Sequence, residues 1–308
     1  MFKVTATNLS REKGKAKTQV PAIVIDELGV QGDAHAGPTQ RQVSLLSKES
    51  IDNFAARIKK PLPYGVFGEN LTLSGIELST VRIFDKFLIN DVMLQVTQIG
   101  KKCHGDVCAI YREVGECIMP KEGVFCRVLK GGMVKPGDEG KYLPRDLKIL
   151  IITLSDRAYH QVYPDKSGAI AKSLIADFFA AKWQAQIASV LLPDNADLLY
   201  QRLLAAIQEQ VDVVFTLGGT GIGSKDVTVA TVSSLCDKLV PGVMEQIRGK
   251  YSANPHALLS CSIFGIAKET QIYTLPGSVR AVTEYLSEIF KILEHAIFMV
   301  HDVDVHGQ

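Results

Sequence analysis

The chain changes character within the stretch KPGDEGKYLPRDLKILIIT, residues 135–153. The first part of this stretch contains two prolines and two glycines, which favour turns and interrupt regular structure. The last part, LKILIIT, is a nearly continuous apolar run with the length of a buried strand. We therefore expect a boundary here, between one domain over residues 1–142 and a second over residues 143–308.

The segment before the boundary is predicted to be mostly β-structure. Short runs rich in β-branched residues, separated by turn residues, predict strands over 20–25, 86–89 and 92–99, the last two as a hairpin. One helix is expected over 47–58, where apolar residues recur on one face. Many short strands with one or two helices favour a barrel-like β domain.

The segment after the boundary shows strands that alternate with helices. The pattern predicts strands over 147–153, 186–192, 211–216 and 270–275. It predicts helices over 167–183, 196–210 and 242–251, one that begins at Thr228, and a final helix over 279–300. Such alternation is typical of an α/β domain, here a doubly wound, mainly parallel sheet with helices on both faces.

Composition and charge exclude several classes of protein. A formal net charge of +1 provides no global field for nucleic acid or for an anionic membrane surface. The first residues, MFKVTATNLSREKG, carry charges too early for a secretory signal, and charged residues interrupt the apolar stretch 279–300 at helical spacing. We expect a soluble cytoplasmic protein that keeps its six cysteines reduced.

A glycine-rich stretch, TLGGTGIGSKDVT, occupies residues 216–228 between a predicted strand and a predicted helix. A loop in this position presents backbone N–H groups at a helix N-terminus, where an anion is favoured. The spacing matches neither a phosphate-binding P-loop, since Ser224 and Lys225 stand in reversed order, nor the G-x-G-x-x-G dinucleotide fingerprint. Taken alone, the stretch is equally compatible with a permissive turn.

Further motifs lie before and after this glycine-rich loop. SDRAY at 155–159, LLPD at 191–194, VPGVMEQIR at 240–248 and LPGSVRAV at 275–282 flank GGTG and KDVT in order. Together these motifs resemble the molybdopterin adenylyltransferase family over residues 146–302. The resemblance implies transfer of AMP from ATP to the terminal phosphate of molybdopterin, with release of pyrophosphate. It also implies a homo-oligomer, with a trimer favoured, and contact with other proteins of molybdenum cofactor biosynthesis.

The resemblance assigns roles residue by residue. Asp194 and Asp226 match the family's functional carboxylates and would hold Mg²⁺, a cation that takes oxygen ligands. N-capping is an alternative role for both, because each precedes a predicted helix. The remaining matches would contact phosphate or form the wall of the site: Ser155, Asp156, Arg157, Gly218, Gly219, Thr220, Gly221, Pro276, Gly277 and Ser278.

The N-terminal segment resembles a second family. The stretches GDAHAGPTQRQVSLLSKESI (32–51), GVFGENLTLSGIEL (65–78), LQVTQIGKKCH (94–104) and CIMPKEGVFCRVLKGGMVKPGD (117–138) are similar to the MOSC domain. The resemblance implies a barrel-like β domain that handles sulfur or binds molybdenum cofactor through a cysteine, which here is Cys103. Lys101, Lys102 and His104 would favour its thiolate. The alternative is a buried, inert thiol.

Several other readings of these residues stay open. A zinc site formed by Cys103, His104, Cys108, Cys117 and Cys126 is disfavoured by the spacing of the first two cysteines. His35 is interpreted as a turn or anion-contact residue. The basic run Arg11, Lys13, Lys15 and Lys17 is interpreted as a solvated loop, with attraction of a phosphorylated pterin as the alternative.

The favoured hypothesis is an enzyme, a molybdopterin adenylyltransferase that uses MgATP. A second hypothesis is a binding or carrier protein that holds molybdopterin or the finished cofactor without catalysing AMP transfer. Retention of both Asp194 and Asp226 argues for the enzyme.

Overall fold

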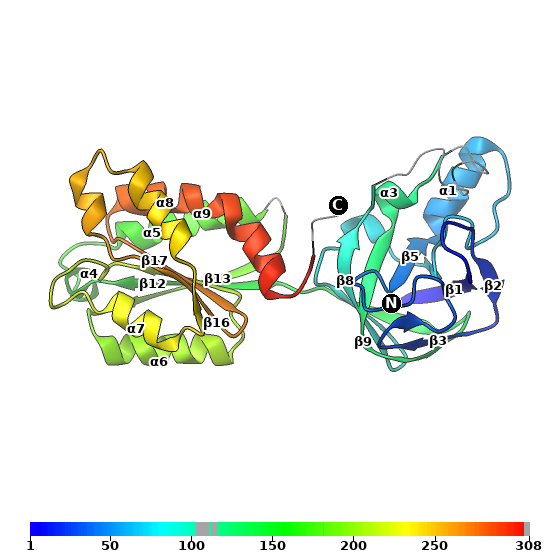
Figure 1. The fold of residues 1–308 in the computed structure, drawn as a ribbon, viewed down its shortest axis with the longest axis horizontal. Helices are drawn as coiled ribbons and strands as arrows, with labels where there is room; N and C mark the ends of the chain where they lie inside the picture. The colour runs from blue at the N-terminus through cyan, green and yellow to red at the C-terminus, as the bar shows by residue number, and fades with distance from the viewer. Residues whose placement is uncertain (103–110, 112–115, 181, 305–308) are drawn as a thin grey trace. The chain divides into compact units, whose positions relative to one another are not determined.

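The computed structural model describes residues 1–102, 111, 116–180 and 182–304 (Figure 1). The chain divides into two compact units. The N-terminal unit is Met1–Arg145, joined by the described residues Val303 and Asp304, and the C-terminal unit is Asp146–Asp302. The first is mostly β-structure and the second is α/β, as the sequence predicts. Among the described residues, no helix is long and apolar enough to cross a membrane.

The N-terminal unit is built around a closed ring of strands. In the described residues, the ring contains β1 (Phe2–Leu9), β6 (Leu71–Ser74), β5 (Val43–Ser47), β9 (Val124–Lys130), β8 (Val92–Ile99), β7 (Lys86–Ile89) and β11 (Glu139–Leu143). β11 pairs with both β7 and β1, which closes the sheet into a barrel. The pairs are antiparallel except β5 with β6. The predicted hairpin forms between β7 and β8.

Shorter elements complete this unit. β2 (Thr18–Val20) pairs with one end of β1, and β10 (Gly132–Val134), β3 (Ile23–Asp26) and β4 (Gly29–Val30) form a separate antiparallel sheet. α1 (Lys48–Ile58), η1 (Leu78–Thr80) and α3 (Met119–Glu122) are its helical segments in the described residues.

The prediction of a single strand over residues 20–25 is wrong. The structure divides it at Pro21 into β2 and β3, which belong to different sheets. Proline has no backbone N–H to donate to a strand ladder, so the chain changes sheets at this residue.

Strand β5 has both faces buried, because it lies between two hydrophobic clusters. Leu45 packs into the barrel core, and the next residue, Leu46, packs against Ile51 and Phe54 of α1. Ser47 ends the strand and caps α1, since its side chain accepts a hydrogen bond from the N–H of Ser50. The helix predicted over 47–58 therefore begins at its cap.

The C-terminal unit contains a six-stranded sheet in the order β13-β12-β14-β17-β16-β15. The strands β13 (Ala185–Leu192), β12 (Leu147–Leu154), β14 (Val213–Leu217) and β17 (Thr270–Leu275) run parallel. β16 (Phe264–Ala267) and β15 (Lys238–Leu239) continue the sheet with antiparallel pairing.

Helices cover both faces of this sheet. The helical segments in the described residues are α4 (Asp156–Tyr159), α5 (Lys166–Ala180), α6 (Ala196–Gln208), α7 (Thr228–Leu235), α8 (Pro241–Lys250), η3 (Pro255–Leu259) and α9 (Val279–Val300). Figure 1 shows α6 and α7 on one face, with α5, α8 and α9 on the other. Leu150 and Ile152 of β12 pack in one core cluster with Leu199 of α6 and Val232 of α7.

Candidate functional site

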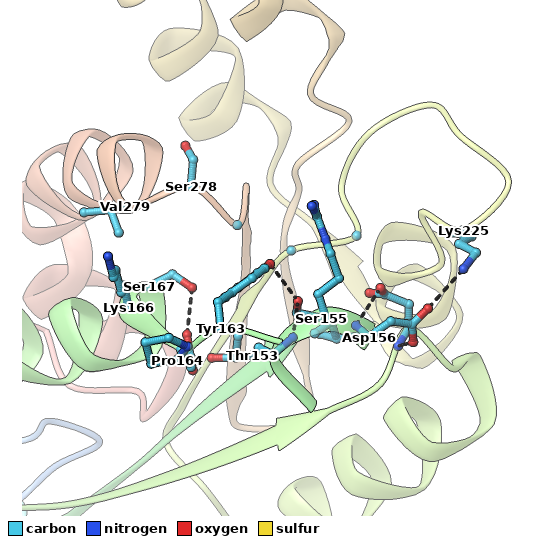
Figure 2. A pocket seen from close by; sticks show the side chains of 18 of the residues that line it. Thr153, Ser155, Asp156, Tyr163, Pro164, Lys166, Ser167, Lys225, Ser278 and Val279 are labelled. Atoms are coloured by element: carbon cyan, nitrogen blue, oxygen red, sulfur yellow. Dashed lines mark hydrogen bonds and ion pairs between the residues drawn. The ribbon is translucent and has the colours of Figure 1, made fainter. Parts of the chain in front are cut away.

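A pocket of about 740 Å³ opens at the carboxyl ends of the parallel strands in the C-terminal unit. Its walls come from four loops, because Ser155 follows β12, Asp194 follows β13, Gly218 follows β14 and Gly277 follows β17. The carboxyl ends of parallel strands meet at one edge of a sheet, so residues far apart in the sequence converge there. In Figure 2, Ser155 and Tyr163 lie between Ser278 on one side and Lys225 on the other.

The structure brings most of the predicted residues of this unit together. Those that line the pocket are Ser155, Asp156, Arg157, Asp194, Gly218, Gly219, Asp226, Gly277 and Ser278. Thr220, Gly221 and Pro276 are not among the residues that line the pocket, although Thr220 and Pro276 are next to lining residues in the chain. Thr220 is buried, and its carbonyl accepts a hydrogen bond from the N–H of Cys261.

Asp156 and Asp194 hold each other through a reciprocal pair of hydrogen bonds. The N–H of Asp156 donates to Oδ2 of Asp194 at 3.1 Å, and the N–H of Asp194 donates to Oδ1 of Asp156 at 3.0 Å. Nζ of Lys225 lies 3.1 Å from the second carboxylate oxygen of Asp156. The backbone hydrogen bond from Asp194, followed by the contact with Lys225, lowers the pKa of Asp156 below its ordinary value.

The alternative prediction, that Asp194 and Asp226 are helix N-caps, is wrong. Asn195 caps α6, because its side chain accepts from the N–H of Leu198. Val227 occupies the N-cap of α7 and provides no side-chain hydrogen bond. Asp194 instead accepts from Asp156, and Oδ2 of Asp226 accepts from the N–H of Gly223 at 2.8 Å. Each carboxylate therefore keeps oxygen lone pairs for a ligand, since one ionised carboxylate accepts several hydrogen bonds.

The glycine loop begins as a tight turn. Gly218 and Gly219 have φ angles of 104° and 62°, a region that glycine adopts without strain. Thr228 closes the turn, because its hydroxyl donates to the carbonyl of Gly218 at 2.8 Å and its N–H donates to the carbonyl of Gly219 at 3.1 Å. A Cβ on Gly219 would lie 2.4 Å from the hydroxyl oxygen of Thr228. The turn thus requires glycine on steric grounds.

The prediction that the N–H of Gly218 contacts phosphate is wrong. The N–H of Gly218 donates to the carbonyl of Leu275 at 2.9 Å, so it extends the ladder between β14 and β17 and is not available to a phosphate. Gly221 has a different importance. A Cβ at this position would lie 2.7 Å from Oδ2 of Asp226, so a glycine here leaves room for that carboxylate.

The stretch YPDKS, residues 163–167, also lines the pocket but was not predicted from the sequence. The hydroxyls of Tyr163 and Ser155 are 3.2 Å apart, and the Arg157 guanidinium lies 5.5 Å from the centroid of the Tyr163 ring. Asp165 accepts from the hydroxyl of Ser167 and from the N–H of Gly168 at the start of α5. An aspartate before a helix, in the same loop as SDRAY, was the signal that could have found this wall.

The pocket combines charges of both signs. Its lining contains the carboxylates of Asp156, Asp165, Asp194 and Asp226 and the cationic side chains of Arg157, Lys166 and Lys225. Carboxylates can bind a divalent cation while the cationic groups bind phosphate oxygens. No cluster of three or more metal-ligating side chains occurs within residues 1–102, 111, 116–180 and 182–304. Because carboxylates and cationic side chains line the same pocket, the lining suits a cation that arrives with a phosphate ligand.

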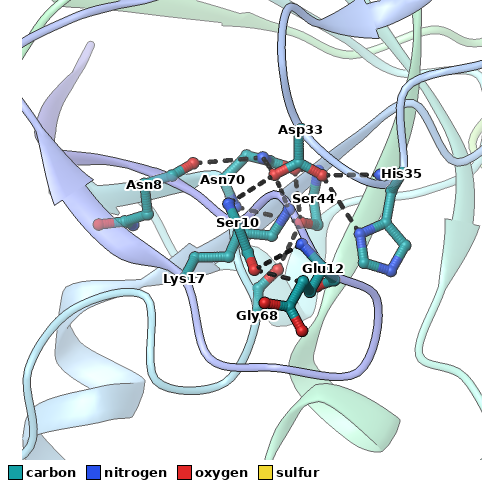
Figure 3. Close-up of polar contacts among 9 residues, drawn as sticks. All are labelled: Asn8, Ser10, Glu12, Lys17, Asp33, His35, Ser44, Gly68 and Asn70. Atoms are coloured by element: carbon teal, nitrogen blue, oxygen red, sulfur yellow. Dashed lines mark hydrogen bonds and ion pairs between the residues drawn. The ribbon is translucent and has the colours of Figure 1, made fainter.

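Of the residues predicted to be functional in the N-terminal unit, some lie outside the described residues and others are buried. Cys103, His104 and Cys108 lie outside the described residues. Cys126 is fully buried in the barrel core, and this burial raises the pKa of its thiol. The prediction of a solvated loop is wrong for Lys17, whose side chain is 1% exposed and forms an ion pair with the buried Asp33 at 2.5 Å (Figure 3).

Comparison with known families assigns both units. Residues 150–295 match the family described as "Probable molybdopterin binding domain", and residues 31–140 match the MOSC domain. These matches define a chain with a MOSC domain followed by a domain of the molybdopterin-binding type.

Three relatives of the C-terminal unit make the comparison specific. "Molybdenum cofactor synthesis protein cinnamon" of Drosophila melanogaster is 34% identical over 49% of this chain and 25% of its own length. "Molybdenum cofactor biosynthesis protein B" of Bacillus cereus is 32% identical over 52% of this chain and 95% of its own length. "Molybdopterin adenylyltransferase" of Pyrococcus furiosus is 32% identical over 51% of this chain and 95% of its own length.

The chain belongs to the family that these bacterial and archaeal proteins represent, with a MOSC domain as its N-terminal unit. It spans only about a quarter of the length of the cinnamon protein.

Proposed function

We propose that this protein acts in molybdenum cofactor biosynthesis and that its C-terminal unit transfers AMP from ATP to molybdopterin. The observation that carries the proposal is the meeting of Asp194, Asp226 and the glycine turn in one pocket. A relative named molybdopterin adenylyltransferase, 32% identical over nearly its whole length, supports the choice of reaction.

The reaction is a nucleotidyl transfer. An oxygen of the terminal phosphate of molybdopterin attacks the α-phosphorus of ATP, and a new phosphorus–oxygen bond forms. The bond from that phosphorus to the bridging oxygen of the β-phosphate breaks, and pyrophosphate leaves with the electron pair. Such a transfer depends mainly on positioning the reacting groups and on neutralising phosphate charge.

The lining residues divide between these two tasks. Asp194 and Asp226 would hold Mg²⁺ of MgATP, which neutralises phosphate charge when bound. Arg157, Lys166 and Lys225 would contact phosphate oxygens, and Lys225 would leave Asp156 to do so. The reciprocal hydrogen bonds between Asp156 and Asp194 hold the loops that follow β12 and β13 together before ligand binds.

The test is formation of adenylylated molybdopterin and pyrophosphate by the full-length chain supplied with molybdopterin and MgATP. Asp226→Asn should lower the rate by roughly a hundredfold or more, a typical loss when one charge-stabilising group is removed. Asp197→Asn is the matched control, because Asp197 is exposed in the first turn of α6 and does not line the pocket. An unmodified chain that binds molybdopterin and transfers no AMP would instead support the carrier hypothesis.

The proposed role of the N-terminal unit rests on the sequence. Sulfur handling or cofactor binding through Cys103 is a separate proposal, since Cys103 lies outside the described residues. Cys103→Ser should abolish sulfur loading of the protein and leave AMP transfer intact. Unchanged sulfur loading in this variant would remove Cys103 from the mechanism.

A further inference from the structure

Tyr163 is the only aromatic residue among the described residues that line the pocket of the C-terminal unit. It is 43% exposed, although a tyrosine ring usually loses most of its contact with water on folding. The core of the unit therefore leaves much of its apolar surface unused. A half-exposed ring in the wall of a charged pocket is available to a ligand.

Two contacts fix the orientation of this ring. The Tyr163 hydroxyl lies 3.2 Å from the hydroxyl oxygen of Ser155, and the Arg157 guanidinium lies 5.5 Å from the ring centroid in a cation–π contact. Ser155 is itself held, because its hydroxyl oxygen accepts from the N–H of Ala158 at 3.2 Å as the N-cap of α4. A ring that is already oriented loses little further freedom when a ligand stacks on it.

The surroundings of the ring combine apolar surface with positive charge. Two apolar lining residues, Pro164 and Val279, lie on one side of Tyr163 in Figure 2, and Lys225 lies on the opposite side. Lys166 lines the pocket on the same side as the two apolar residues. A ligand that joins a flat ring to phosphate groups can therefore contact the tyrosine ring and a cation at the same time.

We propose that Tyr163 determines specificity in this pocket, because the flat nitrogen heteroaromatic ring of a phosphorylated substrate stacks on its side chain. The proposal rests on the proposed AMP transfer, whose two substrates both contain such a ring, the adenine of ATP and the pterin of molybdopterin. A pocket with charges alone recognises phosphate groups of any origin. Stacking on Tyr163 adds recognition of the organic part of the substrate, with a gain of roughly tenfold in affinity.

Equilibrium binding to the full-length protein, measured by isothermal titration calorimetry, tests the proposal. The ligands are MgATP, neopterin phosphate as a phosphorylated pterin, and magnesium tripolyphosphate, which has phosphate groups and no ring. Tyr163→Leu should weaken binding of at least one ring-containing ligand by roughly tenfold and leave the affinity for tripolyphosphate unchanged. A loss for MgATP alone identifies adenine as the stacked ring, and a loss for neopterin phosphate alone identifies the pterin.

Two further variants separate stacking from support of the loop. Tyr163→Phe keeps an aromatic ring and removes the hydroxyl that contacts Ser155, so it should bind the ring-containing ligands as the unmodified protein does. Tyr159→Leu is the matched control and should leave every affinity unchanged, because Tyr159 is 48% exposed in α4 and does not line the pocket. Urea unfolding shows whether each variant is folded. Tyr163→Met replaces Tyr163→Leu if the leucine variant does not fold, since methionine adapts to irregular space.

Several results would overturn the role of Tyr163. Unchanged affinity of Tyr163→Leu for both ring-containing ligands removes the stacking contact, as does a lack of binding of either ligand to the unmodified protein. An equal loss for tripolyphosphate assigns the effect to the charged groups, and an equal loss in Tyr163→Phe assigns it to the hydroxyl.

Failure of the proposed function gives a different result, because these measurements need no AMP transfer. A chain with ring-dependent binding that forms no product keeps the role of Tyr163 and loses the proposed reaction. An active chain whose affinities do not depend on the ring keeps the reaction and loses the role of Tyr163.

Discussion

Glu69 is a fully buried acid in the N-terminal unit, and its burial has a cost that depends on pH. Oε1 accepts hydrogen bonds from the N–H of Gly65 at 2.5 Å and from the hydroxyl of Thr72 at 3.3 Å. Oε2 has no hydrogen-bond partner among the described residues. Desolvation raises the pKa of Glu69 to about 7, although the hydrogen bonds act in the opposite direction.

This shift predicts that the folded protein loses stability as pH rises from about 4.5 to about 7. In that window the folded state keeps a proton that the unfolded state has released, so the free energy of unfolding falls, by roughly 3 kcal/mol in total. Glu69→Gln cannot ionise, and it should flatten this pH dependence and stabilise the protein at pH 8. Urea unfolding at pH 5 and pH 8 measures the effect.

Glu27→Gln is the matched control for this prediction, because Glu27 is exposed in the same unit. The control should keep the pH dependence of the unmodified protein. Equal slopes for Glu69→Gln and the unmodified protein would show that Glu69 does not titrate differently in the folded and unfolded states.

At the residue scale, the sequence predicted which residues meet but not how they are held. Asp194 and Asp226 lie in one pocket because they follow parallel strands, and that follows from strand order. Capping by Asn195 could not be distinguished from capping by Asp194, because both residue types are favoured at a helix start. Burial of Lys17 was not predictable either, since its partner Asp33 is distant in the sequence and a basic run usually stays solvated.

At the scale of single elements, Ser278 serves as the N-cap of α9. Its hydroxyl accepts from the N–H of Ala281 at 3.2 Å, and the same residue lines the pocket. Ser278→Ala should lower the free energy of unfolding by about 1 kcal/mol, because an N–H in the first turn loses its acceptor. Ser278→Asp should keep this stability and lower the rate of AMP transfer, since it adds a negative charge beside bound phosphate.

Urea unfolding and the AMP-transfer assay measure the two effects separately. If Ser278→Asp transferred AMP at the unmodified rate, Ser278 would be a cap with no part in phosphate binding. If Ser278→Ala were as stable as the unmodified protein, water would replace the hydroxyl at no cost.

The elements that the sequence predicted best are the long ones with a clear hydrophobic period. The strand LKILIIT and the final helix follow from local patterns and lie where expected, as β12 and α9. β15 and β16 were not predicted, because β15 has only two residues and β16 interrupts the alternation of strands and helices. β16 pairs with β17 across a tight turn at Lys268 and Glu269, and β15 pairs with β16.

At the scale of the whole molecule, the C-terminal unit has the features of an independent folding unit. Asp212 joins its beginning to its end, because one carboxylate oxygen accepts from the N–H of Lys148 at 2.8 Å and the other lies 3.1 Å from Nε2 of His301. Residues 146–302, expressed alone, should therefore unfold in one cooperative transition and transfer AMP at the rate of the full-length chain.

Circular dichroism during urea unfolding and the AMP-transfer assay would check this prediction. A fragment without a cooperative transition would show that the unit depends on the rest of the chain for its stability. A folded fragment that is inactive, beside an active full-length chain, would show that the N-terminal unit contributes to the reaction.

The change of character near residue 140 was enough to predict two domains of different class, because composition and periodicity both change there. Closure of the N-terminal sheet into a ring was expected only in general terms. It depends on β1 pairing with β11, whose residues are more than 130 positions apart, such as Phe2 with Gly140. Pairings of this range leave no local signal in the sequence.

The reciprocal hydrogen bonds between Asp156 and Asp194 have a dynamic consequence. The amide of each residue is sheltered by the carboxylate of the other, so neither loop can open to solvent and leave the other closed. In amide hydrogen exchange, the two N–H groups should therefore exchange as one cooperative unit. A cation that binds the carboxylate of Asp194 competes with the N–H of Asp156 for that carboxylate. Cation binding on the loop after β13 should therefore loosen the loop after β12.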